Sequence, residues 1–197
     1  MDTSHTRVAA LCLCALLLAA TAPPANAVTA HAIRTASLST RALRRELDSA
    51  EKLLRTQLAA LPEGSGVVLV REPGHLTLRI PASELFAADS AQFAPQSARA
   101  LPWSAVIALL RRQSRLQAQI FVYSDSIGGA SVNQSFSEQR ALALLAPLHA
   151  ASIRPERVSA QGLGAAAELD VNDTPEGREQ NRRVEVVFGP PEKPSPT

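Results

Sequence analysis

The stretch from Ile120 to Arg140 constrains the fold more than any other part of this sequence. A short apolar run ends abruptly at Asp125, small residues and glycines follow, and a segment rich in alanine and leucine comes next. This order is typical of a strand, a loop and a helix. It places the Asp125 carboxylate at the mouth of the strand.

Three polar residues and one leucine of the following helix are spaced so that they share one stripe. Four residues lie at successive intervals of four, three and four: Asn133, Ser137, Arg140 and Leu144. Such spacing places side chains on one helix face, whose polar end can turn back toward Asp125. We therefore expect a carboxylate and a guanidinium to flank a small space suited to a zwitterion. The alternative is a structural ion pair between Asp125 and Arg140.

Charge and composition narrow the functional classes. The chain has 197 residues and a formal net charge of +2, which gives no electrostatic reason to expect nucleic acid as a partner. It is 46% apolar but only 4% aromatic. These values predict one globular domain with flanking segments.

The N-terminus has the pattern of a cleavable secretory leader. An apolar run from Val8 to Ala22 follows Arg7, and Ala25-Asn26-Ala27 offers small residues at the −3 and −1 positions of a cleavage site. The run is shorter than the roughly 20 residues of a membrane span, although an uncleaved anchor is the alternative. We therefore expect a signal peptide at residues 1–27 and a periplasmic location.

The two cysteines fall inside this leader. Leu11 and Leu13 stand where a lipoprotein signal needs small residues before Cys12 and Cys14, so lipidation is not expected. The mature chain would have no cysteine, and hence no disulfide and no thiolate metal site. We expect no metal and no cofactor.

A leucine-rich stripe predicts an amphipathic helix from Thr40 to Leu61 within an N-terminal flank, residues 28–62. Its apolar residues recur at helical intervals: Leu43, Leu47, Ala50, Leu54, Leu58 and Leu61. Residues 28–39 are only weakly patterned, so we expect the helix to begin near Thr40. It is either a coiled-coil or docking helix, or a helix that lies on its own domain. Fewer than four heptads favours the latter.

The rest of the chain alternates strand and helix signals. The expected elements are a hairpin (67–71 and 75–80), a helix (95–112), strands (117–123 and 157–161), a short helix capped by Thr174, and a final strand through Phe188. Pro73-Gly74 suits a type II turn in the hairpin. Pro147 predicts a kink or an end in the helix after Asp125. The proline-rich residues 189–197 are predicted to be a disordered tail.

Several of these residues together resemble the OmpA-like C-terminal peptidoglycan-binding domain, shared by OmpA proteins, the peptidoglycan-associated lipoprotein and flagellar stator proteins. The resemblance covers Val67 to Phe188, in an expected domain of residues 63–188. It is carried by Asp125, Gly128, Asn133, Ser137, Arg140 and Ala141, by the blocks at 172–178 and 181–186, and by Phe86 to Pro95. It implies an α/β, or α+β two-layer, fold of βαβαβ type, with a mixed β-sheet and helices on one face.

The resemblance also implies non-covalent binding of peptidoglycan at the diaminopimelate of the peptide stem. The Asp125 position would take the ligand's ammonium and the Arg140 position its carboxylate, since a guanidinium can hold a carboxylate by two parallel hydrogen bonds. Further polar contacts are expected from Asp89, Ser124, Asn133 and Arg182. Asp89 has the alternative of capping a turn. Arg182 and Arg183 have the alternative of being solvated charges, and in an alternating strand only one of them can face the pocket.

The sequence departs from the family pattern just before Asp125. Val122, Tyr123 and Ser124 stand where the family usually has glycine, then histidine or phenylalanine, then threonine. Ser124 keeps a hydroxyl, and Tyr123 would supply an aromatic wall. Val122 would change the shape of the pocket.

Other functional classes have less support. The histidines of the mature chain, His31, His75 and His149, have no catalytic or zinc motif around them, so we do not expect an enzyme. The remaining alternative is a periplasmic or outer-membrane interaction or assembly protein that keeps the fold but has weak or no wall binding. Expected partners are therefore peptidoglycan, with outer-membrane or other envelope proteins as further candidates.

Overall fold

The computed structural model describes residues 25–94 and 101–190, with side chains from Thr40 onward. The chain divides into two units, Met1–Leu38 and Ser39–Thr197. The second unit carries the sheet, the core and the site. The apolar run of the predicted leader, Val8–Ala22, and residues 191–197 of the predicted tail lie outside the described residues.

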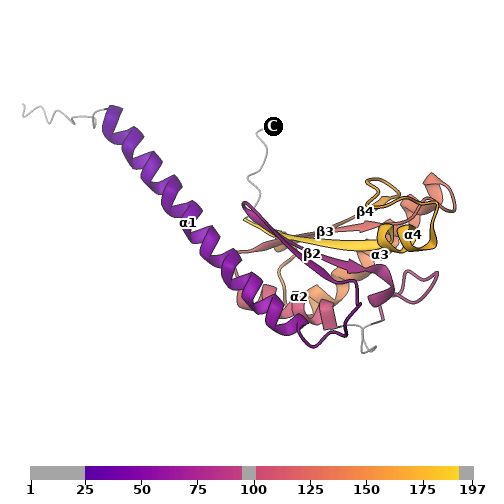
Figure 1. Cartoon of the computed structure of the whole chain (residues 1–197). Coiled ribbons are helices and arrows are strands. Elements are labelled where there is room, and N and C mark those ends of the chain that lie inside the picture. Colours follow the sequence, from indigo (N-terminus) through magenta and orange to yellow (C-terminus); the bar gives the residue numbers. More distant parts are fainter. Residues whose placement is uncertain (1–24, 95–100, 191–197) are drawn as a thin grey trace, which may run out of the picture. The chain divides into compact units, whose positions relative to one another are not determined.

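Five strands form one mixed sheet (Figure 1). In chain order they are β1 (Val68–Glu72), β2 (His75–Pro81), β3 (Gln117–Tyr123), β4 (Val158–Gly164) and β5 (Arg183–Gly189). Their order in the sheet is β1-β2-β5-β3-β4. β3 and β4 are parallel, whereas the other neighbours are antiparallel. The last strand in sequence therefore lies in the middle of the sheet.

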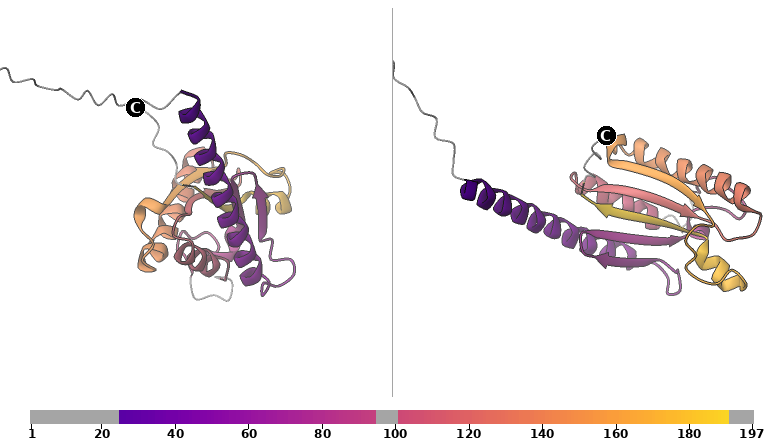
Figure 2. Two further views of the ribbon diagram at one scale, coloured as in Figure 1. Left: turned by 90° about the vertical axis from the view of Figure 1, so that its left-hand side faces the viewer. Right: turned by 90° about the horizontal axis from the view of Figure 1, so that it is seen from above.

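The described residues form the helices α1 (Ala25–Leu58), α2 (Leu101–Arg112), α3 (Ala130–Ala150) and α4 (Pro175–Asn181), with 3₁₀ turns at Ala82–Glu84 and Pro155–Arg157. Figure 1 shows α2 and α3 on the same side of the sheet, and in Figure 2 (right) α3 runs alongside β4. This arrangement confirms the predicted fold class.

Period-two alternation in the central strands builds the core. The fully buried strand residues are Leu76, Leu78 and Ile80 in β2, Ile120 and Val122 in β3, and Val184, Val186 and Phe188 in β5. Helix side chains such as Leu109 and Leu144 join the same cluster. Each fully buried residue of this kind contributes about 1.5–3 kcal/mol.

The first helix differs from its prediction at both ends, since it begins before Thr40 and ends at Leu58 rather than Leu61, but its middle supports the prediction. α1 begins at Ala25, fifteen residues before Thr40; alanine, which recurs through residues 25–36, is the best helix former, so apolar periodicity is not needed there. Leu47, Ala50 and Leu54 are fully buried in the second unit. The leucine stripe thus packs on its own domain.

Other local predictions have mixed outcomes. Gly74 has a φ of 101°, as position i+2 of a type II turn requires, and β1 and β2 form the predicted hairpin. α3 continues through Pro147 to Ala150, so the regular helix does not end at the proline. β4 extends to Gly164 rather than Gln161. Residues 95–100 of the predicted 95–112 helix lie outside the described residues, and α2 begins at Leu101.

Two glycines bring the elements around the site close together. A Cβ on Gly162 of β4 would lie 2.1 Å from the backbone nitrogen of Glu138, so only glycine lets α3 approach β4 this closely. A Cβ on Gly177 would lie 2.0 Å from the Val171 carbonyl. Thr174 Oγ1 accepts a hydrogen bond from the Gly177 nitrogen at 3.0 Å, which confirms the predicted cap of α4.

Candidate functional site

A cavity of about 630 Å³ lies beyond the end of β3. Its walls come from the segment after β2, the loop after β3, α3 and α4. All six residues that the sequence nominated line it: Asp89, Ser124, Asp125, Asn133, Arg140 and Arg182. The fold therefore gathers residues from four separate segments around one space.

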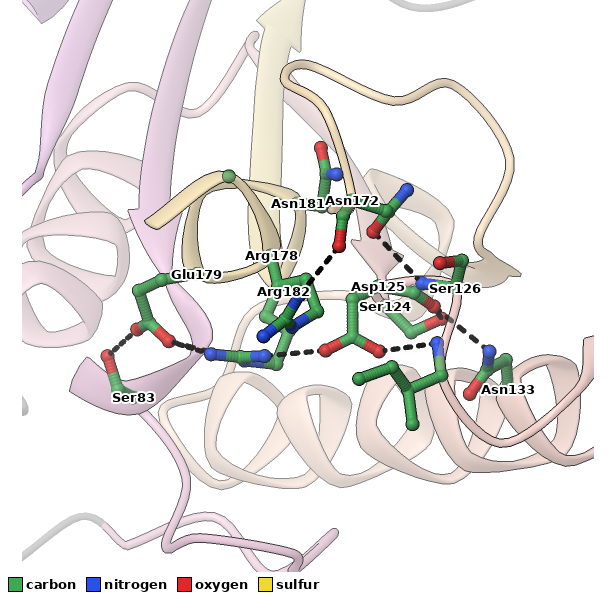
Figure 3. Close-up of polar contacts among 12 residues, drawn as sticks. Ser83, Ser124, Asp125, Ser126, Asn133, Asn172, Arg178, Glu179, Asn181 and Arg182 are labelled. Atoms are coloured by element: carbon green, nitrogen blue, oxygen red, sulfur yellow. Dashed lines mark hydrogen bonds and ion pairs between the residues drawn. The ribbon is translucent and has the colours of Figure 1, made fainter. Parts of the chain in front are cut away.

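Asp125 is held firmly at the mouth of β3 (Figure 3). Its side chain is buried, and its Oδ1 accepts a hydrogen bond from the Ile127 nitrogen at 3.0 Å. Asn133 Nδ2 donates to the Asp125 carbonyl at 2.9 Å. The neighbouring Ser126 nitrogen donates to Asn172 Oδ1 at 3.1 Å. These bonds fix both the carboxylate and the loop that carries it.

A guanidinium from the C-terminal end of α4 pairs with this carboxylate. Arg182 Nη1 lies 2.5 Å from Asp125 Oδ2, and Arg182 Nη2 lies 2.5 Å from Glu179 Oε2. Ser83 Oγ in turn donates to Glu179 Oε1 at 2.7 Å, as Figure 3 shows. Burial works against the charge of Arg182, but its hydrogen bonds to Glu179 and Asp125 raise its pKa above the ordinary value.

Arg140 occupies the opposite wall of the cavity and is buried between two aromatic rings. Its Cζ lies 4.8 Å from the centroid of Phe86 and 4.3 Å from that of Phe136. Its Nε donates to the Ser90 carbonyl at 2.9 Å. Burial lowers the pKa of the Arg140 guanidinium, while the negative charge of Asp89 partly offsets this. The group remains a cation, because arginine does not deprotonate in proteins.

The terminal nitrogens of Arg140 have no hydrogen-bond partner among the described residues. No described carboxylate lies within ion-pair distance of them, and Asp125 pairs with Arg182 instead. The structural ion pair between Asp125 and Arg140 is therefore absent from this structure. A buried cation with free donors on a cavity wall can receive an anionic group from outside the chain.

The remaining nominated residues have distinct roles. Asn133 is buried and supports the Asp125 backbone, whereas Ser124 Oγ donates to the Asp125 carbonyl at 3.0 Å. Asp89 is exposed, has a φ of 48° and makes no hydrogen bond within the described residues, so it does not cap a turn there. Its carboxylate remains available at the rim of the cavity.

Of the two adjacent arginines, only Arg182 faces the cavity. Arg183 is buried, and its guanidinium carbon lies 3.7 Å from the centroid of the Tyr123 ring. It donates to the Ala167 carbonyl at 2.9 Å and to Glu185 Oε1 at 2.9 Å. The prediction that only one of the pair can face the pocket is thus confirmed.

Comparison with known proteins assigns the chain to a family. The family model described as OmpA matches residues 85–182. The outer membrane protein A of Bordetella avium is 30% identical over 135 residues, which cover 66% of this chain and 70% of that protein. The chain belongs to the OmpA family.

Two further relatives differ from this chain in length. The probable lipoprotein YiaD of Escherichia coli is 32% identical over 144 residues, covering 73% of this chain. The match spans 63% of that relative's length. The peptidoglycan-binding protein ArfA of Mycobacterium tuberculosis is 38% identical over 65 residues, covering 33% of this chain and 20% of that protein.

Solved structures share the fold described above. A putative MotB-like protein from Desulfovibrio vulgaris superposes with a TM-score of 0.67 at 27% identity, covering 77% of this chain and 98% of that one. The cell wall anchor of the T6SS from Pseudomonas aeruginosa gives a TM-score of 0.61 at 25% identity, covering 70% and 96%.

Of the three departures from the OmpA-family pattern before Asp125, Ser124 lines the cavity, whereas Val122 and Tyr123 do not. Val122 is fully buried against the core, and it does not line the cavity. The expectation that Tyr123 supplies an aromatic wall is wrong, because its ring lies beneath Arg183 rather than at the cavity.

Eight of the residues that line the cavity were not nominated as site residues from the sequence, and four of them have evident roles. Phe86 and Phe136 supply the aromatic walls, while Ser83 and Glu179 fix Arg182. Two of them left a readable signal: Phe136 is four residues before Arg140 and Glu179 is three before Arg182, both spacings of neighbours on a helix face. Phe86 belongs to the block that carried the family resemblance, although no role was assigned to it. Ser83 left no signal, since its proximity depends on how β2 leads into the cavity.

The described part of the chain offers no grouping of histidine, cysteine or carboxylate side chains that could hold a metal ion. Nor does any described helix have the length and apolarity required to cross a membrane.

Proposed function

We propose that this chain binds peptidoglycan without cleaving it, by holding the zwitterionic end of diaminopimelate in the peptide stem. The observation that carries the proposal is Arg140, a buried cation whose terminal nitrogens are unpaired on the wall of a cavity that also contains Asp125. The ligand's carboxylate would bind Arg140 through two parallel hydrogen bonds.

The ligand's ammonium would bind Asp125. This carboxylate already accepts one hydrogen bond on each oxygen, from Ile127 and from Arg182. Two carboxylate oxygens offer about four acceptor sites, so an added donor does not have to displace Arg182. Asp89 at the rim supplies a further negative charge for the same ammonium.

Relatives support this class of ligand. One is named a peptidoglycan-binding protein, and one solved structure of the same fold is titled a cell wall anchor. Both names describe attachment rather than catalysis. Charge-assisted hydrogen bonds contribute about 1.5–3 kcal/mol each, and two or three of them suit a reversible tether.

The test is co-sedimentation of residues 28–197 with purified diaminopimelate-type peptidoglycan. Asp125→Ala and Arg140→Ala should each abolish binding, and Arg140→Lys should nearly do so because an ammonium cannot form the paired bonds. Asp173→Ala and Arg55→Ala remove exposed charges outside the cavity and should bind as the wild type does. Binding that survives both cavity substitutions would defeat this site assignment.

The Asp125–Arg182 ion pair favours a second candidate, an envelope interaction or assembly protein that keeps the fold with weak or no wall binding. In that case Arg182 would occupy the position of the ligand's ammonium permanently. Wild-type protein would then fail to co-sediment, and Arg182→Ala would lower stability without affecting any wall binding.

We also propose export to the periplasm, with residues 1–27 removed as a signal peptide. Intact-mass measurement on the periplasmic fraction should place the mature N-terminus at Val28. A membrane-bound species that retains residues 1–27 would overturn this proposal.

A further inference from the structure

The end of the domain opposite the cavity carries six exposed arginines, which we call the basic end. They come from three segments: Arg41 and Arg45 of α1, Arg111, Arg112 and Arg115 around the α2–β3 connection, and Arg154 before β4. Of these six arginines, only Arg115 lies within ion-pair distance of a described carboxylate, at 3.5 Å from Glu46. The other five form no ion pair with a described carboxylate, although the exposed Glu156 lies in the same segment as Arg154.

Direct contacts join the three segments into one surface. Arg157 is buried beside Arg154, and its guanidinium donates to the carbonyls of Leu110, Gln113 and Leu116. This ties the segment before β4 to the α2–β3 connection. Gln113 Nε2 donates to Ser49 Oγ at 3.0 Å, which, with the Arg115–Glu46 pair, adds α1.

The basic end is far from the cavity, and the cavity end has the opposite charge. β3 begins at Gln117 beside the basic end and leads to Asp125. At about 3.3 Å per residue, the two ends are about 25 Å apart. Exposed carboxylates gather near the cavity end, on the loop after β4 and on α4: Glu168, Asp170, Asp173 and Glu176. A net charge of only +2 therefore conceals a strong separation of charge.

We propose that the basic end docks on the anionic phospholipid headgroups of a bilayer, so that the cavity faces away from the membrane. Arginines near an anionic leaflet are attracted by its surface potential, without any fitted apolar contact. A protein partner would instead need apolar or aromatic anchors at the centre of the interface. None of the exposed large hydrophobic residues of the described chain belongs to the three segments: they are Val68, Ile127, Val132, Leu142, Leu169 and Val171.

The test uses residues 28–197, which retain every residue of the core cluster. The probe is co-sedimentation with vesicles of phosphatidylcholine containing about one third phosphatidylglycerol. Each arginine beside such a surface increases the partitioning of a protein onto the vesicles about fivefold. The double variant Arg111→Gln with Arg112→Gln should therefore bind the vesicles about twentyfold more weakly. The matched control, Lys52→Gln with Arg55→Gln, removes the same charge farther along α1 and should change binding less than threefold.

Three results would overturn the proposal: equal binding to pure phosphatidylcholine, no binding at low salt, or equal loss in the control variant. Concentration-dependent self-association that disappears in the double variant would also overturn it, because the basic end would then contact the acidic end of another copy. Vesicle binding does not depend on the wall-binding proposal. Peptidoglycan co-sedimentation should be unchanged in the double variant, so failure of either proposal can be distinguished from failure of the other.

Discussion

Arg182 Nη1 lies 2.5 Å from Asp125 Oδ2, so the free protein already balances the carboxylate at the centre of its cavity with a cation of its own. Glu179 holds the other side of the same guanidinium and is itself fixed by Ser83. Arg182 is therefore shared between two carboxylates. A ligand's ammonium would meet Asp125 in a partly neutralised state, which suits weak and reversible binding.

The Asp125–Arg182 pair should stabilise the fold modestly. The Arg182 side chain is 37% exposed, so solvent screening limits its coupling with Asp125 to about 0.5–1 kcal/mol. A double-mutant cycle of Asp125→Ala and Arg182→Ala, followed by urea unfolding, measures this coupling. Additive effects, within about 0.3 kcal/mol, would show that the pair contributes nothing to stability.

Phe136 should matter for binding more than for folding. Its ring lies 4.3 Å from the Arg140 guanidinium carbon and helps hold the cation in its orientation. Cation–π contacts contribute about 0.5–2 kcal/mol, so Phe136→Ala should lower peptidoglycan affinity by a factor between about two and about thirty. The comparison is Val132→Ala, an exposed change on the same helix, which should leave affinity unaltered. Equal affinities for the two variants would remove Phe136 from the site.

The leucine stripe of α1 should behave as part of the core. Leu54 is fully buried, so Leu54→Ala should lower the free energy of unfolding by about 2–5 kcal/mol. Leu142 is 58% exposed on α3, and Leu142→Ala should change stability by less than about 0.5 kcal/mol. Denaturant unfolding compares the two.

The same burial predicts how the chain behaves without α1. Residues 28–197 should sediment as a monomer, because the stripe is occupied within its own domain. A chain beginning at residue 63 should be destabilised or unfolded, since it lacks Leu47, Ala50 and Leu54. A dimer of residues 28–197 alongside a well-folded monomer of residues 63–197 would instead indicate a dimer seam.

Gly162→Ala should be strongly destabilising. The new Cβ would lie 2.1 Å from the Glu138 nitrogen, so α3 would have to move away from β4. We expect a loss of at least about 2 kcal/mol, at the upper range of overpacking. Ser159→Ala, at an exposed position of the same strand, serves as the control. Unchanged stability in Gly162→Ala would mean that α3 shifts without cost.

Features set by neighbouring residues could be predicted from the sequence. Alternation placed Val184, Val186 and Phe188 in the core, Pro73-Gly74 formed the turn and Thr174 capped α4. Helical spacing likewise put Asn133 and Arg140 on the buried face toward Asp125. Each of these depends on contacts within a few residues, where backbone geometry leaves few choices. The family resemblance then supplied the remaining members of the site.

Only the tertiary structure decided which charges meet. Arg182 follows Asp125 by 57 residues, and they pair because β5 enters the sheet between β2 and β3. The same topology turned Tyr123 toward Arg183 and brought Phe86 against Arg140. Neither periodicity nor propensity encodes such distant pairings, because they depend on strand order and on the approach of α3 to β4. The free donors of Arg140 are therefore a property of the folded domain, since every described carboxylate lies beyond ion-pair distance of them.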